Sequence, residues 1–290
     1  MKDRHQQIVD ASRKDAVRPW WWPVWMVIRT LAVAYLVILL LAMFFEESLI
    51  FFPSKYPNGD WSPQGLTVED AQFTAADGTK LHGWYVPHGK PLAQVLFFHG
   101  NAGNLTHRID VLRELHRRVG VAVLIVDYRG YGKSEGKPNE AGILQDGRAA
   151  RKWLAERAGI TENDVVLMGR SLGTGVATDL TTDVKPKALI LENAFTSMPD
   201  VAGVHYPFLP VQLAMSTRLN SREKIASYHG PLLQSHGTID EVIPFELGQK
   251  LYDACPSEHK RFLPFEGMRH NDFHQPEYYD NMREFVMALP

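Results

Sequence analysis

The segment from Gly169 to Gly173 has the composition of a turn that presents a serine for chemistry. Its sequence, Gly-Arg-Ser-Leu-Gly, is a G-x-S-x-G motif that follows the apolar run Val165–Met168. The next residues, Thr174–Leu180, are compatible with a helix. A strand, a tight turn and a helix in this order expose the serine hydroxyl and direct unpaired helical N–H groups at it. Ser171 is therefore the candidate nucleophile, although a glycine-rich turn with a solvated serine has the same pattern.

Two positions downstream supply what such a serine needs. A serine hydroxyl becomes nucleophilic when a base takes its proton, and an acid must orient that base. For a serine on a strand-to-helix turn, the acid and then the histidine follow along the chain. The run Leu232–Ser235 predicts a strand that leads to Asp240, and Arg261–Leu263 predicts one that leads to His270. Because ligands of open α/β sheets bind beyond the carboxyl ends of the strands, we expect these side chains to meet Ser171 there.

A glycine-rich loop upstream could hold the negative oxygen that forms during acyl transfer. The expected strand Gln94–Phe98 runs into His99–Asn104, whose sequence is His-Gly-Asn-Ala-Gly-Asn. Preorganised backbone N–H groups stabilise such an oxygen strongly. We expect the N–H of Asn101 in this loop and the N–H of Leu172, next to the serine, to be the two donors.

Around these residues the chain resembles the α/β-hydrolase superfamily, and within it the branch of single-pass, membrane-anchored serine hydrolases with a short cap. The similarity extends from about Val68 to the C-terminus. It is carried by FFHGNAGN (Phe97–Asn104), DYRGYGKSEG (Asp127–Gly136), GRSLGTGVA (Gly169–Ala177), LENAFTSM (Leu191–Met198), HGTIDEVIPF (His236–Phe245) and GMRHND (Gly267–Asp272). The resemblance implies Ser171 as nucleophile, Asp240 as acid and His270 as base. It does not fix the substrate, because the branch includes esterases, thioesterases and lipid hydrolases.

Other residues that could do chemistry have simpler interpretations. Glu192 follows an expected strand and is the alternative acid, but the loop of Asp240 matches the family motif. Cys255 is the single cysteine, which excludes an intramolecular disulfide, and its place at an expected helix end favours a packed residue. The segment Asp127–Ser134 lacks P-loop spacing and predicts a structural turn. The twelve histidines show no zinc-motif spacing, so we expect neither a metal nor a cofactor.

The chain from Gln94 onward alternates expected strands with expected helices. The strands are Gln94–Phe98, Ala122–Val126, Val165–Met168, Ala188–Leu191, Leu232–Ser235 and Arg261–Leu263, and the helices are Thr106–Arg118, Ala141–Ala158, Leu172–Leu180, Phe245–Ala254 and Pro276–Ala288. This alternation predicts an α/β fold with a mainly parallel central sheet and helices on both faces. Two earlier strands, Val68–Phe73 and Leu81–Val86, flank a turn and predict a hairpin that adds an antiparallel edge.

Residues 195–229 interrupt the alternation. They include Pro199, Pro207 and Pro210 among aromatic and aliphatic side chains. By the resemblance, an insertion here is a cap, which could line an acyl-binding groove beside the site or dip toward lipid. A packed pair of connecting helices that touches no substrate is the other interpretation.

Length and charge fit one catalytic domain, which we expect at residues 67–290. The chain has 290 residues and a net charge of −2, so it predicts no basic face for nucleic acid. Before the domain we expect a cytoplasmic segment at residues 1–23, a transmembrane anchor at 24–45 and a linker at 46–66.

The anchor is expected because Thr30–Phe45 carries no charge and Val24–Ile28 extends the run, with Arg29 between them. A spanning helix needs about 20 residues, and an arginine near its end can reach the headgroups. Four tryptophans lie at that end, as interfacial aromatics do, at positions 20, 21, 22 and 25. A signal peptide fits less well, since no A-x-A-like cleavage site follows; a buried core helix is the remaining alternative.

The charges that flank this run predict its orientation. Basic residues precede it at Lys2, Arg4, Arg13, Lys14 and Arg18, and Glu46 and Glu47 follow it. The positive-inside rule then places the N-terminus in the cytoplasm and the catalytic domain on the non-cytoplasmic side.

Together these observations predict a membrane-anchored serine hydrolase that cleaves an ester or thioester of a lipid-like or acylated substrate through an acyl-enzyme. An anchored site favours such substrates because the membrane raises their local concentration. Two alternatives stay open: an aminopeptidase-like amide hydrolase, which would need acidic groups to hold the substrate's amine, and a non-catalytic binding protein on a hydrolase scaffold.

Overall fold

The computed structural model describes residues 19–272 and 275–290. The chain divides into two units, one that ends at Phe44 and one from Phe45 to Pro290. Each unit is described by itself. The basic residues at positions 2–18 that predict the orientation lie outside the described residues.

The first unit contains the helix α2 (Trp22–Phe44). An 18-residue stretch of this 23-residue helix has a mean hydropathy of 2.5, and none of its residues is buried, which argues against a core helix. At 1.5 Å per residue the helix is about 34 Å long, enough to cross the hydrocarbon layer of a bilayer. Arg29 lies near its beginning, with its guanidinium 5.3 Å from the ring centre of Trp25. By length and composition α2 could span a membrane or serve as a signal sequence.

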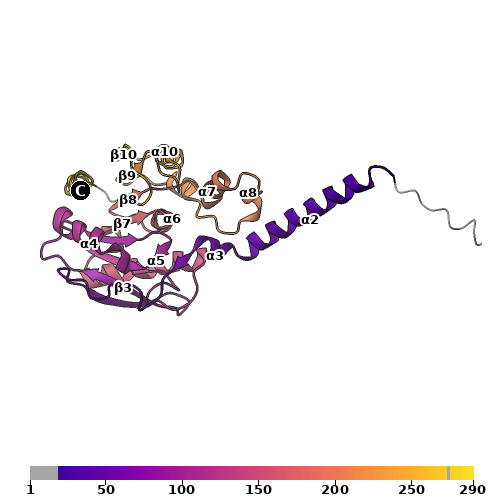
Figure 1. The fold of residues 1–290 in the computed structure, drawn as a ribbon. Helices are drawn as coiled ribbons and strands as arrows, with labels where there is room; N and C mark the ends of the chain where they lie inside the picture. The colour runs from indigo at the N-terminus through magenta and orange to yellow at the C-terminus, as the bar shows by residue number, and fades with distance from the viewer. Residues whose placement is uncertain (1–18, 273–274) are drawn as a thin grey trace, which may run out of the picture. The chain divides into compact units, whose positions relative to one another are not determined.

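The second unit is built on an eight-stranded sheet with the order β10-β9-β8-β7-β4-β6-β3-β2 (Figure 1). The strands are β2 (Glu69–Thr74), β3 (Lys80–Val86), β4 (Gln94–Phe98), β6 (Ala122–Asp127), β7 (Val165–Arg170), β8 (Ala188–Glu192), β9 (Leu232–Gly237) and β10 (Lys260–Phe265). Strands β10 to β6 in that order are parallel, whereas β3 is antiparallel to both β6 and β2. The mainly parallel sheet and the antiparallel hairpin edge are therefore confirmed.

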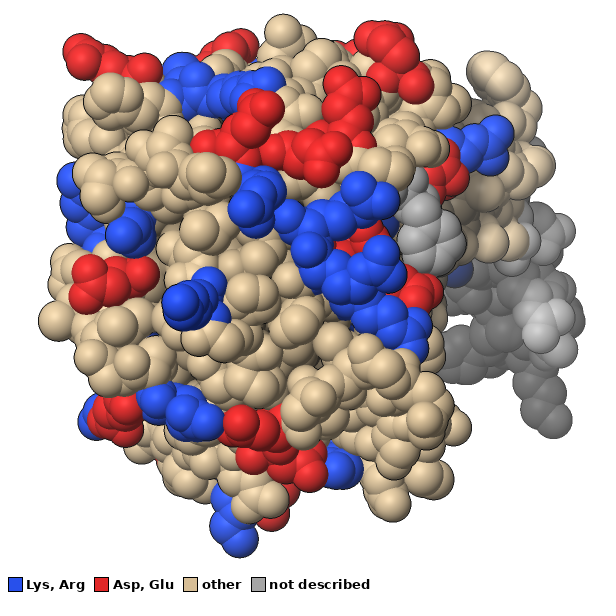
Figure 2. Space-filling view, turned by 90° about the vertical axis from the view of Figure 1, so that its left-hand side faces the viewer, with Lys and Arg blue, Asp and Glu red and all other residues tan. Residues whose placement is uncertain are grey.

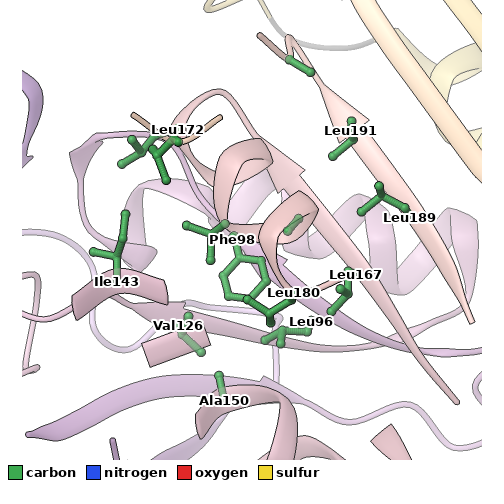
Figure 3. Close-up of a cluster of buried hydrophobic side chains, with 14 of the residues drawn as sticks. Leu96, Phe98, Val126, Ile143, Ala150, Leu167, Leu172, Leu180, Leu189 and Leu191 are labelled. Carbon is green, nitrogen blue, oxygen red and sulfur yellow. The ribbon is translucent and has the colours of Figure 1, made fainter. Parts of the chain in front are cut away.

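Helices cover both faces of this sheet because its central strands are buried on both sides. In β4, Leu96 and Phe98 join one core with the helices α5 (Glu140–Ala158) and α6 (Leu172–Asp179), as Figure 3 shows. Their neighbours Val95 and Phe97 point to the other face and join a second core. That core includes residues of α4 (Ile109–Glu114) and α11 (Pro276–Met287), while α10 (Phe245–Ala254) packs with the first. Side chains that alternate between two cores hold the sheet in one register.

Several elements differ from the expectation in ways that the local chemistry explains. The expected helix Thr106–Arg118 is three pieces: a 3-10 turn from Leu105 to Arg108, then α4, and then a π-helical turn from Leu115 to Val119. Gly120 ends it with a φ of 80°, a left-handed conformation that glycine adopts readily. Most strands extend a residue or two beyond the expected end, because polar residues such as Asp127 continue the ladder.

The segment 46–66, expected as a linker, lies within the second unit. It forms the short helix α3 (Glu46–Ile50) and the strand β1 (Phe52–Pro53). Strand β1 pairs in parallel with β5 (Ala102–Gly103), inside the glycine-rich loop that follows β4. The chain that leaves α2 therefore packs on a loop of the expected site.

The insertion at 195–229 forms three short helices, α7 (Met198–His205), α8 (Val211–Ala214) and α9 (Ser221–Ile225). Its prolines help to set the bounds of α7, since Pro199 lies in its first turn, and Pro207 and Pro210 fall in the connection to α8. We call residues 195–229 the cap.

Candidate active site

Ser171 lies on a strained turn between β7 and α6. Its φ of 53° and ψ of −122° are unusual for a residue with a side chain, and such strain is typical of functional turns. Gly173 makes the turn possible, because a Cβ there would lie 2.0 Å from the carbonyl oxygen of Phe98. The start of α6 thus packs directly on the end of β4, with Ser171 itself almost buried.

The structure brings Ser171, His270 and Asp240 together. His270 Nε2 lies 3.0 Å from the Ser171 hydroxyl oxygen, and His270 Nδ1 lies 2.7 Å from Asp240 Oδ2. With Nδ1–H donated to the carboxylate, Nε2 is left as the acceptor for the serine proton. All three side chains are buried, so these contacts are shielded from water.

Asp240 is held as an anion by the groups around it. Its Oδ1 accepts the backbone N–H groups of Val242 and Ile243 at 2.9 and 2.7 Å, and His236 Nε2 lies 3.4 Å from Oδ2. Burial alone would raise the pKa of this carboxyl, but its contacts with His236, His270 and Ile243 outweigh burial and hold the pKa well below its usual range. Because this folded-state pKa is depressed, the carboxylate stabilises the fold above the unfolded pKa of about 3.9, and that stability is lost as acid protonates it.

Glu192, the alternative acid, has a different partner. It is fully buried at the end of β8 and accepts a hydrogen bond from the Tyr278 hydroxyl of α11. The pKa of that hydroxyl is raised well above its usual value by burial and by the Glu192 charge. This contact ties α11 to the sheet.

The loop after β4 lies against the serine. A Cβ on Gly100 would be 3.4 Å from the Ser171 Cβ, and Asn101 is the next residue in this loop. Leu172 is the first residue of α6, where N–H groups have no intrahelical partner. The two expected donors therefore belong to two different elements, the loop after β4 and the start of α6.

The segment after α2 holds this loop in place. Asn101 donates its side-chain N–H to the carbonyl of Ile50 at 3.0 Å, and its own carbonyl accepts the N–H of Phe52 and the hydroxyl of Tyr131 at 3.1 and 2.7 Å. The hydroxyl of Tyr128 binds the carbonyl of His99 at 2.8 Å. The sequence showed the loop but no sign that residues 50–54 support it.

Two residues that the sequence analysis assigned no role hold the backbone of His270. Arg170 Nη2 and Asn193 Nδ2 each donate to the His270 carbonyl at 3.1 Å. Asn193 has a φ of 50°, which asparagine tolerates better than most residues, and its Oδ1 accepts the N–H of Gly237 at 3.4 Å. The only signal for Asn193 was its place in the LENAFTSM segment. It joins the loops that follow β8, β9 and β10.

The remaining candidates are structural. Arg129 is paired with Asp146 and Asp77 at 2.7 Å each, as expected for a structural turn. Cys255 is buried, and burial raises the pKa of its thiol, so it is a packed residue. In the described part of the chain no group of three or more His, Cys, Asp or Glu side chains could hold a metal ion.

Replacing Asn193 tests its role in positioning His270. We expect Asn193→Gly, which tolerates the φ of 50° but removes both side-chain hydrogen bonds, to lower kcat on an activated ester about tenfold, the effect of about one buried hydrogen bond. KM should change little, since Asn193 acts through His270 rather than on substrate. Steady-state kinetics and a melting curve separate this from a structural role: a lower melting temperature with unchanged kcat would contradict it.

Comparisons with known proteins agree with this architecture. The family model described as "Serine aminopeptidase, S33" matches residues 89–222. The uncharacterized protein Rv2307c of Mycobacterium tuberculosis is 38% identical over 237 residues, which are 81% of this chain and 83% of that protein. The α/β-hydrolase domain-containing protein WAV2 of Arabidopsis thaliana is 33% identical over 79% of this chain and 82% of its own length. Protein bem46 of Schizosaccharomyces pombe is 30% identical over 85% and 88%.

Solved structures share the fold at lower identity. The esterase Pf2001 of Pyrococcus furiosus aligns with a TM-score of 0.68 and 21% identity, over 82% of this chain and 99% of its own. An acetyl xylan esterase from Paenibacillus sp. R4 aligns with a TM-score of 0.65 and 19% identity, over 80% and 86%. With its sheet order, its serine turn and these relatives, the chain belongs to the α/β-hydrolase superfamily.

Proposed function

We propose that this protein is a membrane-anchored serine hydrolase that cleaves ester or thioester bonds of lipid-like or acylated substrates. The observation that carries the proposal is the chain of two contacts from Ser171 through His270 to Asp240, at 3.0 and 2.7 Å. Distances of this kind suit proton transfer from a hydroxyl to an imidazole that a carboxylate orients.

Each step follows from the position of these groups. His270 Nε2 takes the proton of Ser171 as the oxygen attacks the carbonyl carbon, and the anion of Asp240 stabilises the imidazolium. The imidazolium then gives the proton to the leaving alcohol or thiol, which leaves an acyl-serine. Water attacks the acyl group with His270 again as base, and the acid product departs. No cofactor takes part in these steps.

The N–H groups of Asn101 and Leu172 are proposed to bind the negative oxygen of each tetrahedral intermediate. Support comes from the contact of Gly100 with Ser171 and from the helix start at Leu172. Removing one such donor from a hydrolase costs on the order of 10²–10³ in kcat, so the segment that supports the loop matters for rate.

Ester or thioester cleavage is favoured over release of N-terminal amino acids by the composition of the cap. Binding a substrate ammonium requires a carboxylate. The two carboxylates of the cap, Asp200 and Glu223, already accept hydrogen bonds from neighbouring side chains, and residues 202–215 contain neither Asp nor Glu. The aliphatic and aromatic side chains there suit an acyl chain instead. The alternative of a non-catalytic binding protein is less well supported, because binding alone would not require the hydrogen-bonded arrangement of serine, histidine and aspartate.

Substitution of the nucleophile tests the reaction class. We expect Ser171→Ala to fold, to lose labelling by a fluorophosphonate probe, and to lose turnover of p-nitrophenyl esters by a factor on the order of 10⁶. Gel fluorescence and initial rates report both effects, with circular dichroism as the control for folding. Labelling that persists in the alanine variant would assign the nucleophile elsewhere.

The acid is tested by a matched pair of amides. We expect Asp240→Asn to lower kcat by about 10⁴ near neutral pH, because the imidazole would take the wrong tautomer. At high pH the loss should be partly relieved, where hydroxide can replace the impaired base. Glu192→Gln should lose far less activity but some thermal stability, since its contact is with Tyr278. An inactive, well-folded Glu192→Gln beside an active Asp240→Asn would reverse the assignment.

Membrane attachment is tested by fractionation. We expect the full chain to stay in the membrane through carbonate washing, because α2 is long and apolar enough to span it. A chain that starts at Phe45 should be soluble and active, since it keeps Glu46 and β1. Protease added from the non-cytoplasmic side should reach the catalytic unit; full protection until lysis would reverse the orientation and leave the anchor in place.

A further inference from the structure

The cap carries a stretch without a single charged residue. Residues 202–215 contain no Asp, Glu, Lys or Arg. Several of their large side chains face outward, with exposed fractions of 88% for Leu213, 66% for Phe208 and 52% for both Val204 and Tyr206. The face of the catalytic unit in Figure 2 differs, because acidic and basic side chains are interspersed over it. Clustered apolar exposure marks a contact surface.

This stretch is joined to the acid loop of the site. His205, the last residue of α7, lies with Nε2 2.8 Å from the carbonyl oxygen of Val242. The N–H of Val242 in turn binds Asp240. Val242 and Ile239, on either side of Asp240, are 38% and 53% exposed. The exposed apolar residues therefore continue from the cap to the loop that orients His270.

The two residues that directly follow this stretch, Ser216 and Thr217, are tied to the chain that leaves α2. The buried carboxylate of Glu46 accepts the N–H and hydroxyl of Ser216, at 2.9 and 3.0 Å, and the N–H of Thr217 at 2.6 Å. Burial raises the pKa of Glu46, but these hydrogen bonds outweigh it and lower the pKa below its usual value, so the tie persists at neutral pH. Figure 1 shows α3, α7 and α8 on one side of the unit.

The tie limits how far the cap can lie from the end of α2. Glu46 is two residues beyond Phe44, which places it within about 8 Å of that end, since consecutive Cα atoms are about 3.8 Å apart. Leu49, on the helix that Glu46 begins, is 60% exposed. If α2 spans a bilayer, its end lies at the lipid–water interface, where tyrosine and exposed apolar side chains are favoured.

We propose that residues 202–215, together with Leu49, Ile239 and Val242, form a surface that docks in the interfacial layer of the bilayer holding α2. Its occupant is lipid, and docking lets an acyl ester pass from the membrane to Ser171 without crossing water. The proposal rests on the proposed anchor and hydrolase activity. The experiments below measure membrane retention, docking and ester cleavage separately.

Depth-dependent quenching tests the docking directly. The only cysteine, Cys255, is 1% exposed, so a cysteine introduced at Leu213 can be labelled selectively with an NBD fluorophore. The full-length protein is reconstituted in liposomes with or without phosphatidylcholine brominated near the top of its acyl chains. The matched control is Arg117→Cys, an exposed position in the turn that follows α4. Figure 1 shows α4 on the side of the unit away from α7 and α8.

We expect strong quenching and a blue-shifted emission for the label at position 213, and neither for the label at 117. A label at 213 that is no more quenched than the one at 117, in protein that stays in the liposomes, overturns docking and leaves the anchor intact. Shielding at 213 without quenching by bromolipid would place a protein there and would equally overturn it. Protein that washes off the liposomes refutes the anchor and the docking together.

An activity ratio gives the second readout. We expect Leu213→Glu to lower the rate on a long-chain ester dispersed in the liposomes, relative to the rate on soluble p-nitrophenyl acetate, by about tenfold or more, the equilibrium factor for burying one leucine side chain. Arg117→Glu should leave the ratio unchanged. An unchanged ratio in Leu213→Glu overturns the proposal. Absence of cleavage of either ester would refute the proposed activity, and the fluorescence would still decide the docking.

Discussion

The close packing of α6 on the end of β4 is the constraint on which the rest of the site depends. At Gly173 the backbones approach so closely that no side chain fits against the carbonyl of Phe98. This approach turns the chain sharply at Ser171, forces its positive φ, and directs the hydroxyl toward His270. It also brings the loop after β4 against the serine. One steric contact thus sets both the nucleophile and the proposed oxyanion donors.

Placing the base requires contacts from several strands. His270 comes from the loop after β10, two strands away from β8 and three from β7. Its carbonyl is held by Arg170, the last residue of β7, and by Asn193, which follows β8, and its ring is held by Asp240. The His270 loop needs these fixed partners, because loops are otherwise mobile. A low pKa at Asp240 keeps its negative charge opposite the imidazole through the reaction.

The segment between α2 and the sheet links α2 to the candidate site. It contacts the loop after β4 through Ile50 and Phe52 and the cap through Glu46. A linker would need only to span a distance, whereas this one supplies a strand, β1, and a buried carboxylate. Buried charged groups are costly unless they are hydrogen-bonded, and Glu46 is satisfied by the N–H groups of the cap. The proposed membrane attachment and the geometry of the candidate site therefore depend on the same residues.

The sequence by itself determined the elements whose signals are local. Alternating apolar strands and amphipathic helices specified the parallel sheet, the G-x-S-x-G turn specified Ser171, and an uncharged run specified α2, because periodicity, glycine placement and hydropathy act over a few residues. Tertiary structure alone decided which acid faces His270, since Glu192 ends β8 and Asp240 follows β9 at the same edge of the sheet. It also decided which distant groups the side chains of Asn193 and Glu46 bind. Their partners lie 77 and about 170 positions away in the chain, and no local pattern specifies which distant carbonyl or amide a side chain will meet.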